Sequence, residues 1–351
     1  MKTLATIVSV GAITPVGLGA VDSAFSHRAA AAAMREAPLV DREGEPITMC
    51  FLPNLDPLLV GADRAFVLGR RALAEAVSGL GAGASTLRVR LSLTLDEPFG
   101  ERGADGAPLA QAFVESLART VAKTLPDLQI EASARGPAGP AYLLPPLCDA
   151  LASGAIDAAI LGGVHTDYDP RRIAALSASE RLFRNDNIDA FIPGEAAAFV
   201  VLMRADTARR LDLRVQAEIR ATATGYEKAR PDNDASAFQA SGLTAALRTV
   251  MAPLAQVGLR AGWMLTDLTF EVFRHFELQA ASVRTQRWFC EPQQVDSPAQ
   301  RLGHLGAAAM PLHLVFAAEG FRRGYAPHPY AISIAGSDSG ERGAVLISAP
   351  D

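Results

Sequence analysis

The sequence predicts an α/β protein built from two similar layered halves, and three observations lead to this prediction. Strand-like and helix-like stretches alternate along all 351 residues. The alternation runs through once before about residue 206 and once after it. Apolar residues make up 49% of the chain and aromatic residues only 6%, and the abundant Ala and Gly allow helices to pack closely on sheets. We therefore expect an N-terminal half over residues 1–205 and a C-terminal half over residues 206–351.

In the first half, strands are expected where short apolar or alternating runs end at turn residues, and helices where apolar residues recur at helical spacing. The expected strands are 4–10, 86–95, 155–163 and 195–205, and the expected helices are 63–81, 107–125 and 143–154. Pro145 and Pro146 are assigned to the first turn of the last helix, where a missing N–H costs least. Residues 34–62 contain Pro, Asp and Gly without periodicity, so an irregular insertion is expected there.

The second half repeats the alternation with a different sequence. The expected strands are 215–225, 263–270, 329–336 and 343–349, and the expected helices are 236–258, 276–288 and 305–324. The sequence match between the halves is too weak to define a repeat by itself.

Composition and charge argue against several classes of partner. The net charge is −5, and no run of five or six like charges or basic stripe is present, so nucleic-acid binding has no electrostatic support. The apolar stretches fall short of the roughly 18 residues that a membrane span needs. The three cysteines are widely spaced, which favours neither a disulfide framework nor a zinc site. We expect a cytoplasmic protein without a cofactor.

The segment HTDYD (165–169) follows the end of a buried strand and brings His165, Asp167 and Asp169 into one turn. Strand ends of this kind often carry function in α/β sheets. A metal site would need further ligands, and the sequence does not identify them. We therefore expect a solvated turn and no metal site.

Several segments resemble, in order, those of the β-ketoacyl-(acyl carrier protein) synthases, which have the thiolase fold. They are VSVGAITPVGLG (8–19), ASGAIDAAILGG (152–163), the loop and strand 171–202, RLGHLGAAAM (301–310) and AGSDSGERGAVLIS (335–348). The resemblance spans nearly the whole chain. It implies a thiolase-like fold of two similar αβαβα halves, and dimers that join the sheets of two subunits.

The resemblance also implies a chemistry, in which a cysteine thiolate takes an acyl group and two histidines stabilise the enolate of a decarboxylated malonyl unit. Aligned without gaps, the cysteine position falls on Pro137, which has neither a thiol nor the N–H that would form half of the oxyanion hole. The nearest thiol, Cys148, lies well inside the following helix and is expected to be a small buried residue.

The other family positions are only partly kept. The H-G-T loop is absent after residues 263–267, and His275 comes too late to replace its histidine. The family lysine falls on Ala299, and the gating phenylalanine of the closing loop on Ser337 or Ser339. The second histidine matches His304.

The residues that match family positions are too few to form a complete catalytic site. His304 alone cannot carry acyl transfer, because acid–base help presupposes a nucleophile. We expect it to be a polar group at the start of the helix 305–323. Glu195 matches a glutamate that is mainly structural in the family. Glu195, His304 and Ser337 remain candidate pocket residues, and no residue is assigned as catalytic.

The hypothesis that follows is a catalytically inactive ketosynthase-like protein acting as a partner or accessory subunit, as chain-length factors do. One alternative is a divergent active β-ketoacyl synthase of fatty-acid or polyketide synthesis. Another is an accessory or adaptor protein of a secretion or effector gene cluster. The expected partners are a second copy or an active ketosynthase-like subunit, with acyl carrier protein as a further candidate.

Overall fold

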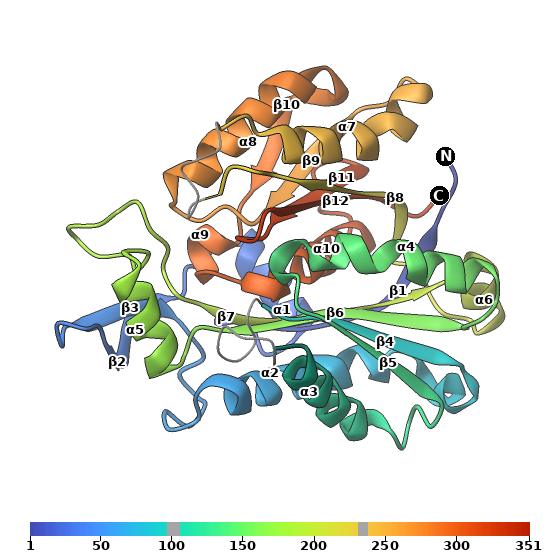
Figure 1. The fold of residues 1–351 in the computed structure, drawn as a ribbon. Helices are drawn as coiled ribbons and strands as arrows, with labels where there is room; N and C mark the ends of the chain where they lie inside the picture. The colour runs from blue at the N-terminus through green and yellow to red at the C-terminus, as the bar shows by residue number, and fades with distance from the viewer. Residues whose placement is uncertain (97–105, 231–237) are drawn as a thin grey trace.

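A computed structural model describes residues 1–96, 106–230 and 238–351, and it shows a mixed α/β chain built around one large sheet (Figure 1). This sheet has ten strands in the order β10-β9-β11-β12-β8-β1-β7-β6-β4-β5. A second sheet pairs β2 with β3.

The strands are β1 (Ala5–Ile13), β2 (Met34–Val40), β3 (Pro46–Cys50), β4 (Val89–Thr94), β5 (Leu128–Ser133), β6 (Ala158–Thr166), β7 (Glu195–Met203), β8 (Ala217–Tyr226), β9 (Ala261–Thr266), β10 (Phe289–Asp296), β11 (Tyr330–Gly336) and β12 (Glu341–Ser348). The helices are α1 (Ala20–Arg28), α2 (Gly61–Ser78), α3 (Gly106–Val121), α4 (Gly139–Ala152), α5 (Pro170–Ala178), α6 (Ala205–Arg210), α7 (Ser241–Gln256), α8 (Val272–Thr285), α9 (Ala299–Leu302) and α10 (Ala309–Arg322). Within the described ranges, none of these helices combines the length and apolarity that crossing a membrane requires.

The two halves of the large sheet have the same topology. Numbered along the chain within each half, the strands of both halves lie in the order 1-5-4-2-3. The pairings also correspond, with two antiparallel pairs followed by two parallel pairs in each half. The halves join where β1 runs antiparallel to β8. A repeat too weak to define from sequence is therefore plain in the strand order.

Helices cover both faces of each half-sheet (Figure 1). The helices α4 and α10 lie between the two halves, and their buried side chains form one apolar cluster with strands from both. On the outer faces, α2 and α3 cover the first half, and α7 and α8 cover the second. Burial of these apolar faces is the main favourable term in folding, and it produces the layered thiolase-like architecture.

Of the irregular insertion expected over residues 34–62, only residues 51–60 lie outside a hairpin or a helix. Residues 34–50 form the hairpin of β2 and β3, and helix α2 begins at Gly61. The hairpin packs through Ile47 and Met49 against Tyr168 and Ile173. Because β2 is mostly exposed, the strand carries little of the alternation that would identify it.

Helix α4 also begins earlier than expected, at Gly139, so Pro145 and Pro146 lie in its interior rather than its first turn. A proline at 145 cannot donate to the carbonyl of Ala141, but the Thr222 hydroxyl donates to that carbonyl at 3.2 Å. The helix expected over 236–258 begins at Ser241, and residues 236 and 237 lie outside the described residues.

A buried ion pair fixes the segment that connects β3 with α2. The Arg64 guanidinium lies 2.6 Å from the Glu195 carboxylate, and both side chains are almost fully buried. Arg64 also donates to the carbonyl of Leu52, and Glu195 accepts from the N–H of Leu52 at 2.7 Å. Glu195 at the start of β7 therefore holds the chain that leads into α2.

Replacing Glu195 by Gln should lower the free energy of unfolding by about 3–5 kcal/mol, because it leaves the buried Arg64 charge without a counter-ion. Urea denaturation of the variant measures this loss. Asp157→Asn is the matched control, since the Arg88–Asp157 pair is largely exposed and its loss should cost about 0–1 kcal/mol. Equal effects of the two substitutions would contradict the structural role of Glu195.

A second buried titratable group lies in the central layer. His313 on α10 is fully buried, and its Nδ1 lies 3.0 Å from the Ser333 hydroxyl. Burial in this apolar layer lowers the pKa of His313 to about 3, and the nearby His27 adds to the effect. Between pH 6.5 and 3 the unfolded chain takes up a proton that the folded chain refuses, so this group makes stability fall as the pH falls.

His313→Leu should therefore flatten the acid side of the stability profile. We expect its free energy of unfolding to fall less steeply than that of the parent between pH 6 and 4, by up to about 1.4 kcal/mol per pH unit. Denaturant titrations at several pH values give both slopes. Leaving Ser333 without a partner lowers the free energy of unfolding equally at every pH, so comparing the slopes removes this effect. Parallel profiles would show that His313 does not contribute to the pH dependence of stability.

Candidate functional site

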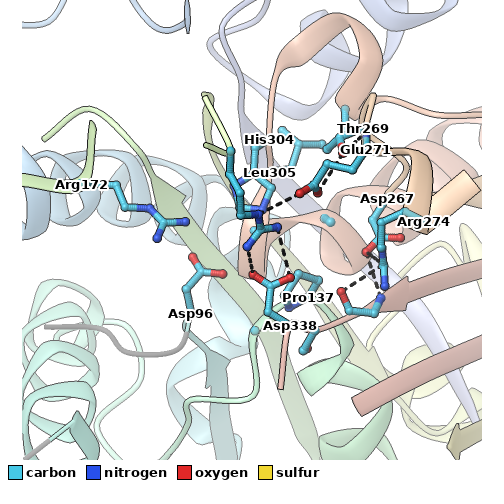
Figure 2. Close-up of a pocket in the computed structure, with 17 residues that line it drawn as sticks. Asp96, Pro137, Arg172, Asp267, Thr269, Glu271, Arg274, His304, Leu305 and Asp338 are labelled. Atoms are coloured by element: carbon cyan, nitrogen blue, oxygen red, sulfur yellow. Dashed lines mark hydrogen bonds and ion pairs between the residues drawn. The ribbon is translucent and has the colours of Figure 1, made fainter. Parts of the chain in front are cut away.

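The fold brings the N-terminal ends of α4 and α10 together with three loops around a small polar cavity (Figure 2). Its volume is about 60 Å³, enough for a few water molecules but far below the roughly 300–1,000 Å³ of pockets that enclose drug-sized ligands. The residues of chemical interest that line it are Asp96, Pro137, Arg172, Arg181, His304 and Ser337.

Pro137 lies at the turn where a helix N-terminus faces the cavity. The short 3-10 helix Gly136–Ala138 leads into α4, and Gly136 adopts φ +57°, a conformation that glycine tolerates best. Pro137 offers neither a thiol nor an N–H. The next N–H, that of Ala138, donates to the Ser337 hydroxyl at 3.2 Å, and this hydroxyl donates to the carbonyl of Arg135. The first N–H after Pro137 is therefore already hydrogen-bonded to Ser337.

Arg181 links two loops across one side of the cavity. Its guanidinium lies 2.8 Å from Glu271 and 2.6 Å from Asp338. These pairs tie the loop after α5 to the loop before α8 and to the loop between β11 and β12. The closing loop, expected to present Ser337 or Ser339 at the gate position, presents Asp338 to Arg181.

Arg274 makes a second set of contacts on the same side. It lies 2.7 Å from Asp267 and donates to the carbonyl of Gly336, while Asp267 accepts from the N–H of Gly336. Asp267 follows β9, where the H-G-T histidine of a ketosynthase was sought. At this position the structure has the Asp267–Arg274 ion pair and no histidine. His275 is exposed on α8, with its Nε2 against the carbonyl of Thr269.

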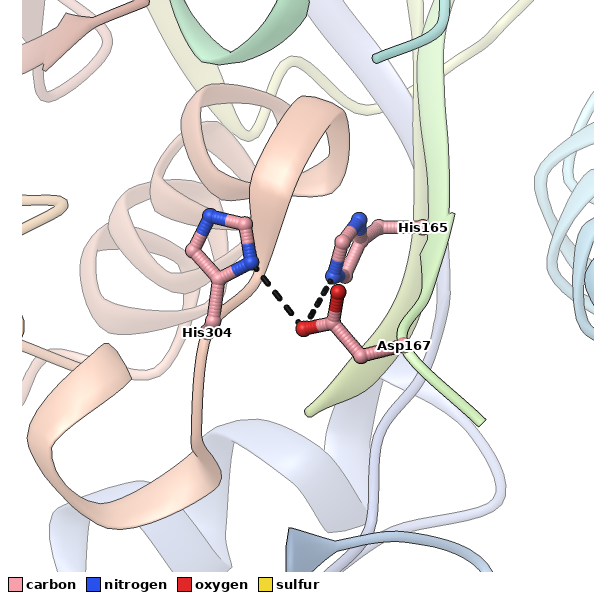
Figure 3. Close-up of side chains that lie close together, drawn as sticks. All are labelled: His165, Asp167 and His304. Carbon is pink, nitrogen blue, oxygen red and sulfur yellow. Dashed lines mark hydrogen bonds and ion pairs between the residues drawn. The ribbon is translucent and has the colours of Figure 1, made fainter. Parts of the chain in front are cut away.

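His304 does line the cavity, but its contacts differ from the expected ones. Helix α10 begins after the 3-10 helix Gly306–Ala308 and has no side-chain cap, so His304 is not an N-terminal group of that helix. Its Nδ1 instead lies 3.1 Å from the carboxylate of Asp167 (Figure 3). The imidazole also packs against the ring of Phe191 in a tilted arrangement, with 4.4 Å between the ring centroids.

The segment HTDYD is not the solvated turn that we expected. His165 and Asp167 are buried, and Asp169 caps helix α5 by accepting from the N–H of Arg171. Nε2 of His165 lies 3.0 Å from Oδ2 of Asp167, the same oxygen that faces His304. Three side chains from two distant parts of the sequence therefore converge (Figure 3).

Two further residues orient this cluster. Asp96, two residues after β4, lies 2.5 Å from Nδ1 of His165 and accepts from the N–H of Ala307 at 2.7 Å. Arg172 on α5 donates to Oδ1 of Asp167 at 2.9 Å. Gly306 has φ +45° and packs directly against Asp96 and His165, which leaves no room for a side chain.

These charges shift the protonation of the cluster. Burial of the imidazole opposes protonation, but the carboxylates of Asp167 and Asp96 outweigh it and raise the pKa of His165 to about 10. Burial likewise opposes ionisation of Asp167, yet His165, His304 and Arg172 hold the pKa of this carboxyl well below its usual range. The cluster therefore contains an ionised carboxylate between two imidazoles.

The remaining sequence candidates lie as follows. Glu195 does not line this cavity and lies instead in its ion pair with Arg64. Ala299 lines the cavity and is buried. Cys148 is buried in α4 away from the cavity, and this burial raises the pKa of its thiol to about 11.

Sequence reasoning missed Asp96, Arg172 and Arg181 at this site. Nothing in their local sequence marks them, because each acts through a partner more than 60 positions away or on another element. HTDYD did give a signal, the strand end, but not the identity of its distant partner.

Comparisons with known proteins agree with this architecture. Residues 141–208 match the family model of the β-ketoacyl synthase N-terminal domain. No curated protein sequence matches the chain.

Solved structures match over the whole chain at low identity. The ishigamide ketosynthase/chain length factor is 17% identical, with 99% of both chains covered and a TM-score of 0.80. The oxazolomycin ketosynthase domain of Streptomyces albus JA3453 is also 17% identical, with 100% of this chain and 74% of that chain covered and a TM-score of 0.79. A type II ketosynthase solved with its acyl carrier protein is 13% identical, with 99% of both chains covered and a TM-score of 0.78. The chain therefore has the fold of ketosynthases over its whole length, and it is similar in sequence to the β-ketoacyl synthase N-terminal domain over residues 141–208.

Proposed function

We propose that this chain is a non-catalytic ketosynthase-like subunit that pairs with an active ketosynthase-type partner, in the manner of a chain-length factor. The observation that carries the proposal is Pro137 at the start of α4, where the fold directs a helix N-terminus at the cavity. A helix N-terminus lowers the pKa of a cysteine placed there and makes it nucleophilic. Proline offers this position no nucleophile.

The small volume of the cavity and its charged lining support the same proposal. An acyl chain needs an apolar channel, whereas this cavity measures about 60 Å³ and is lined by charged groups. Arg181 bridges Glu271 and Asp338, so opening the cavity would separate two ion pairs. A covalent acyl intermediate has neither an attachment point nor space in this arrangement.

The sheet edge at β5 supports a partner role. Strand β5 pairs with β4 in an unbroken parallel register from Leu128 to Ser133. Its sequence LQIEAS contains no Pro, Lys or Arg, the residues that commonly protect an edge. The opposite edge, β10, carries Pro292 and a break in its register. We therefore assign β5 as the edge through which a second subunit joins the sheet.

The solved structures with similar folds give the proposal its direction. One is described as a ketosynthase/chain length factor, and another as a ketosynthase in complex with an acyl carrier protein. Assembly with an active ketosynthase is accordingly the role that we propose, with contact to acyl carrier protein passing through the partner.

The purified chain should not become acylated when it is incubated with acyl carrier protein thioesters or with an epoxide ketosynthase inhibitor. The physical reason is that Cys148 and Cys50, whose pKa burial raises to about 11 and about 12, are protonated and enclosed. Intact-protein mass spectrometry measures the adducts, and an intact ketosynthase treated in parallel serves as positive control. Stoichiometric acylation that Cys148→Ala abolishes would establish the active enzyme instead.

Pairing through β5 should be lost on Ile130→Lys, because the substitution places a charge on the edge strand. We expect light scattering to report a dimer for the parent chain, alone or co-purified with an intact type II ketosynthase, and a monomer for the variant. Val295→Lys on the β10 edge is the matched control and should retain the dimer. A monomeric parent in both conditions, or equal behaviour of the two variants, would refute the assignment.

A further inference from the structure

His165, Asp167 and His304 present three potential metal ligands to one point beside the cavity (Figure 3). One ligand atom from each residue lies within 4.8 Å of the other two. Two imidazoles and one carboxylate form a donor set that suits zinc and related divalent transition metals, with a further position left for water or another ligand.

The spacing of the ligand atoms approaches that of a metal centre. Oδ2 of Asp167 lies 3.0 Å from Nε2 of His165 and 3.1 Å from Nδ1 of His304. With bonds of about 2.0–2.2 Å to a tetrahedral ion, ligand atoms lie about 3.3 Å apart. Small side-chain adjustments are therefore enough to enclose an ion.

An independent observation also points to a ligand at this place. Among the residues that the structure describes, Nε2 of His165 has no hydrogen-bond partner of acceptable geometry, although Oδ2 of Asp167 is 3.0 Å away. The side chain of His165 is only 3% exposed. A buried ring nitrogen without a well-formed hydrogen bond is costly, and a coordinated ion would satisfy it.

The residues around His165 and Asp167 hydrogen-bond to them in the way that residues around metal ligands commonly do. Metal-bound histidines commonly give their other ring N–H to a carboxylate, which fixes the tautomer and the ring orientation. Asp96 takes this position on Nδ1 of His165, and the N–H of Ala307 fixes Asp96 in turn. Arg172 donates to Oδ1 of Asp167, whereas Oδ2 faces both imidazoles and accepts from the N–H of Gly194 at 3.2 Å.

The local charge also favours a cation. Asp96 and Asp167 bring two carboxylates to His165, against the single guanidinium of Arg172.

We propose that His165, Asp167 and His304 together bind one divalent transition-metal ion, for which zinc is the best match. The sequence offered His165 and Asp167 on one strand end, and the fold supplies the third ligand, His304, from the other half of the chain. The ion would join the end of β6 to the segment before α10, and His304 would bring it to the wall of the cavity. The site is independent of the proposed partner role.

The test is a calorimetric titration of the chelator-treated full-length chain with zinc chloride, followed by cobalt(II) as a spectroscopic probe. We expect one ion per chain, a raised melting temperature, and visible cobalt bands typical of four or five ligands. His304→Gln should weaken binding at least tenfold. Asp96→Asn keeps all three ligands and should weaken binding about 10–100-fold, so the site stays testable if the first variant folds poorly.

Two controls separate this site from others. His275→Gln removes an exposed histidine outside the cluster and should leave zinc binding unchanged. Cys290→Ser removes the thiol that lies 3.4 Å from His328 and tests for binding there. Absence of one-to-one binding, binding unaffected by both His304→Gln and Asp96→Asn, or binding lost in Cys290→Ser would overturn the proposal.

Discussion

The buried carboxylate of Asp167 is the contact on which the geometry of the site depends. It meets His165 from β6, Arg172 from α5, the N–H of Gly194 before β7 and His304 before α10. An unpaired carboxylate at this depth would be very unfavourable, so these donors must be in place when the chain is folded. Because His304 belongs to the second half of the chain, Asp167 also fixes one half against the other at the cavity.

The layers around the cavity do not depend on its chemistry. The central cluster is formed by apolar side chains of α4, α10 and the strands, whereas the cavity is lined by the turns that precede those helices. Pro137 illustrates the separation, because a residue at the start of a helix lacks an intrahelical partner for its N–H and loses little when that N–H is missing. The scaffold can therefore stay the same while the cavity is lined by ion pairs.

The sequence predicted the layers more completely than the site, for a physical reason. Strands such as β6 and β7 are buried on both faces and read as continuous apolar runs, so their positions were clear. The exposed β2 and the edge strand β5 carry weak patterns and were missed.

The site depends on contacts across long sequence separations, such as the 137 positions between Asp167 and His304. Local patterns cannot give such pairs. They were available only where the family resemblance placed a residue, as it did for Pro137 and His304. Glu195, which the resemblance makes mainly structural, lies in the buried ion pair with Arg64.

The matching halves explain why Pro137 and His304 face the same cavity. In each half the last central helix follows a 3-10 turn that begins with a glycine at positive φ, Gly136 before α4 and Gly306 before α10. The repeated strand order brings these two turns together between the half-sheets.

The backbone conformation of the two turns is the same, but their side chains differ. The first turn presents a proline and a hydroxyl-bonded N–H, whereas the second follows a histidine and packs on the Asp96–His165 pair. The polar chemistry of the cavity therefore belongs to the second turn and its partners just after β4 and on β6. Those residues, rather than Pro137, offer the polar groups to which a ligand would bind.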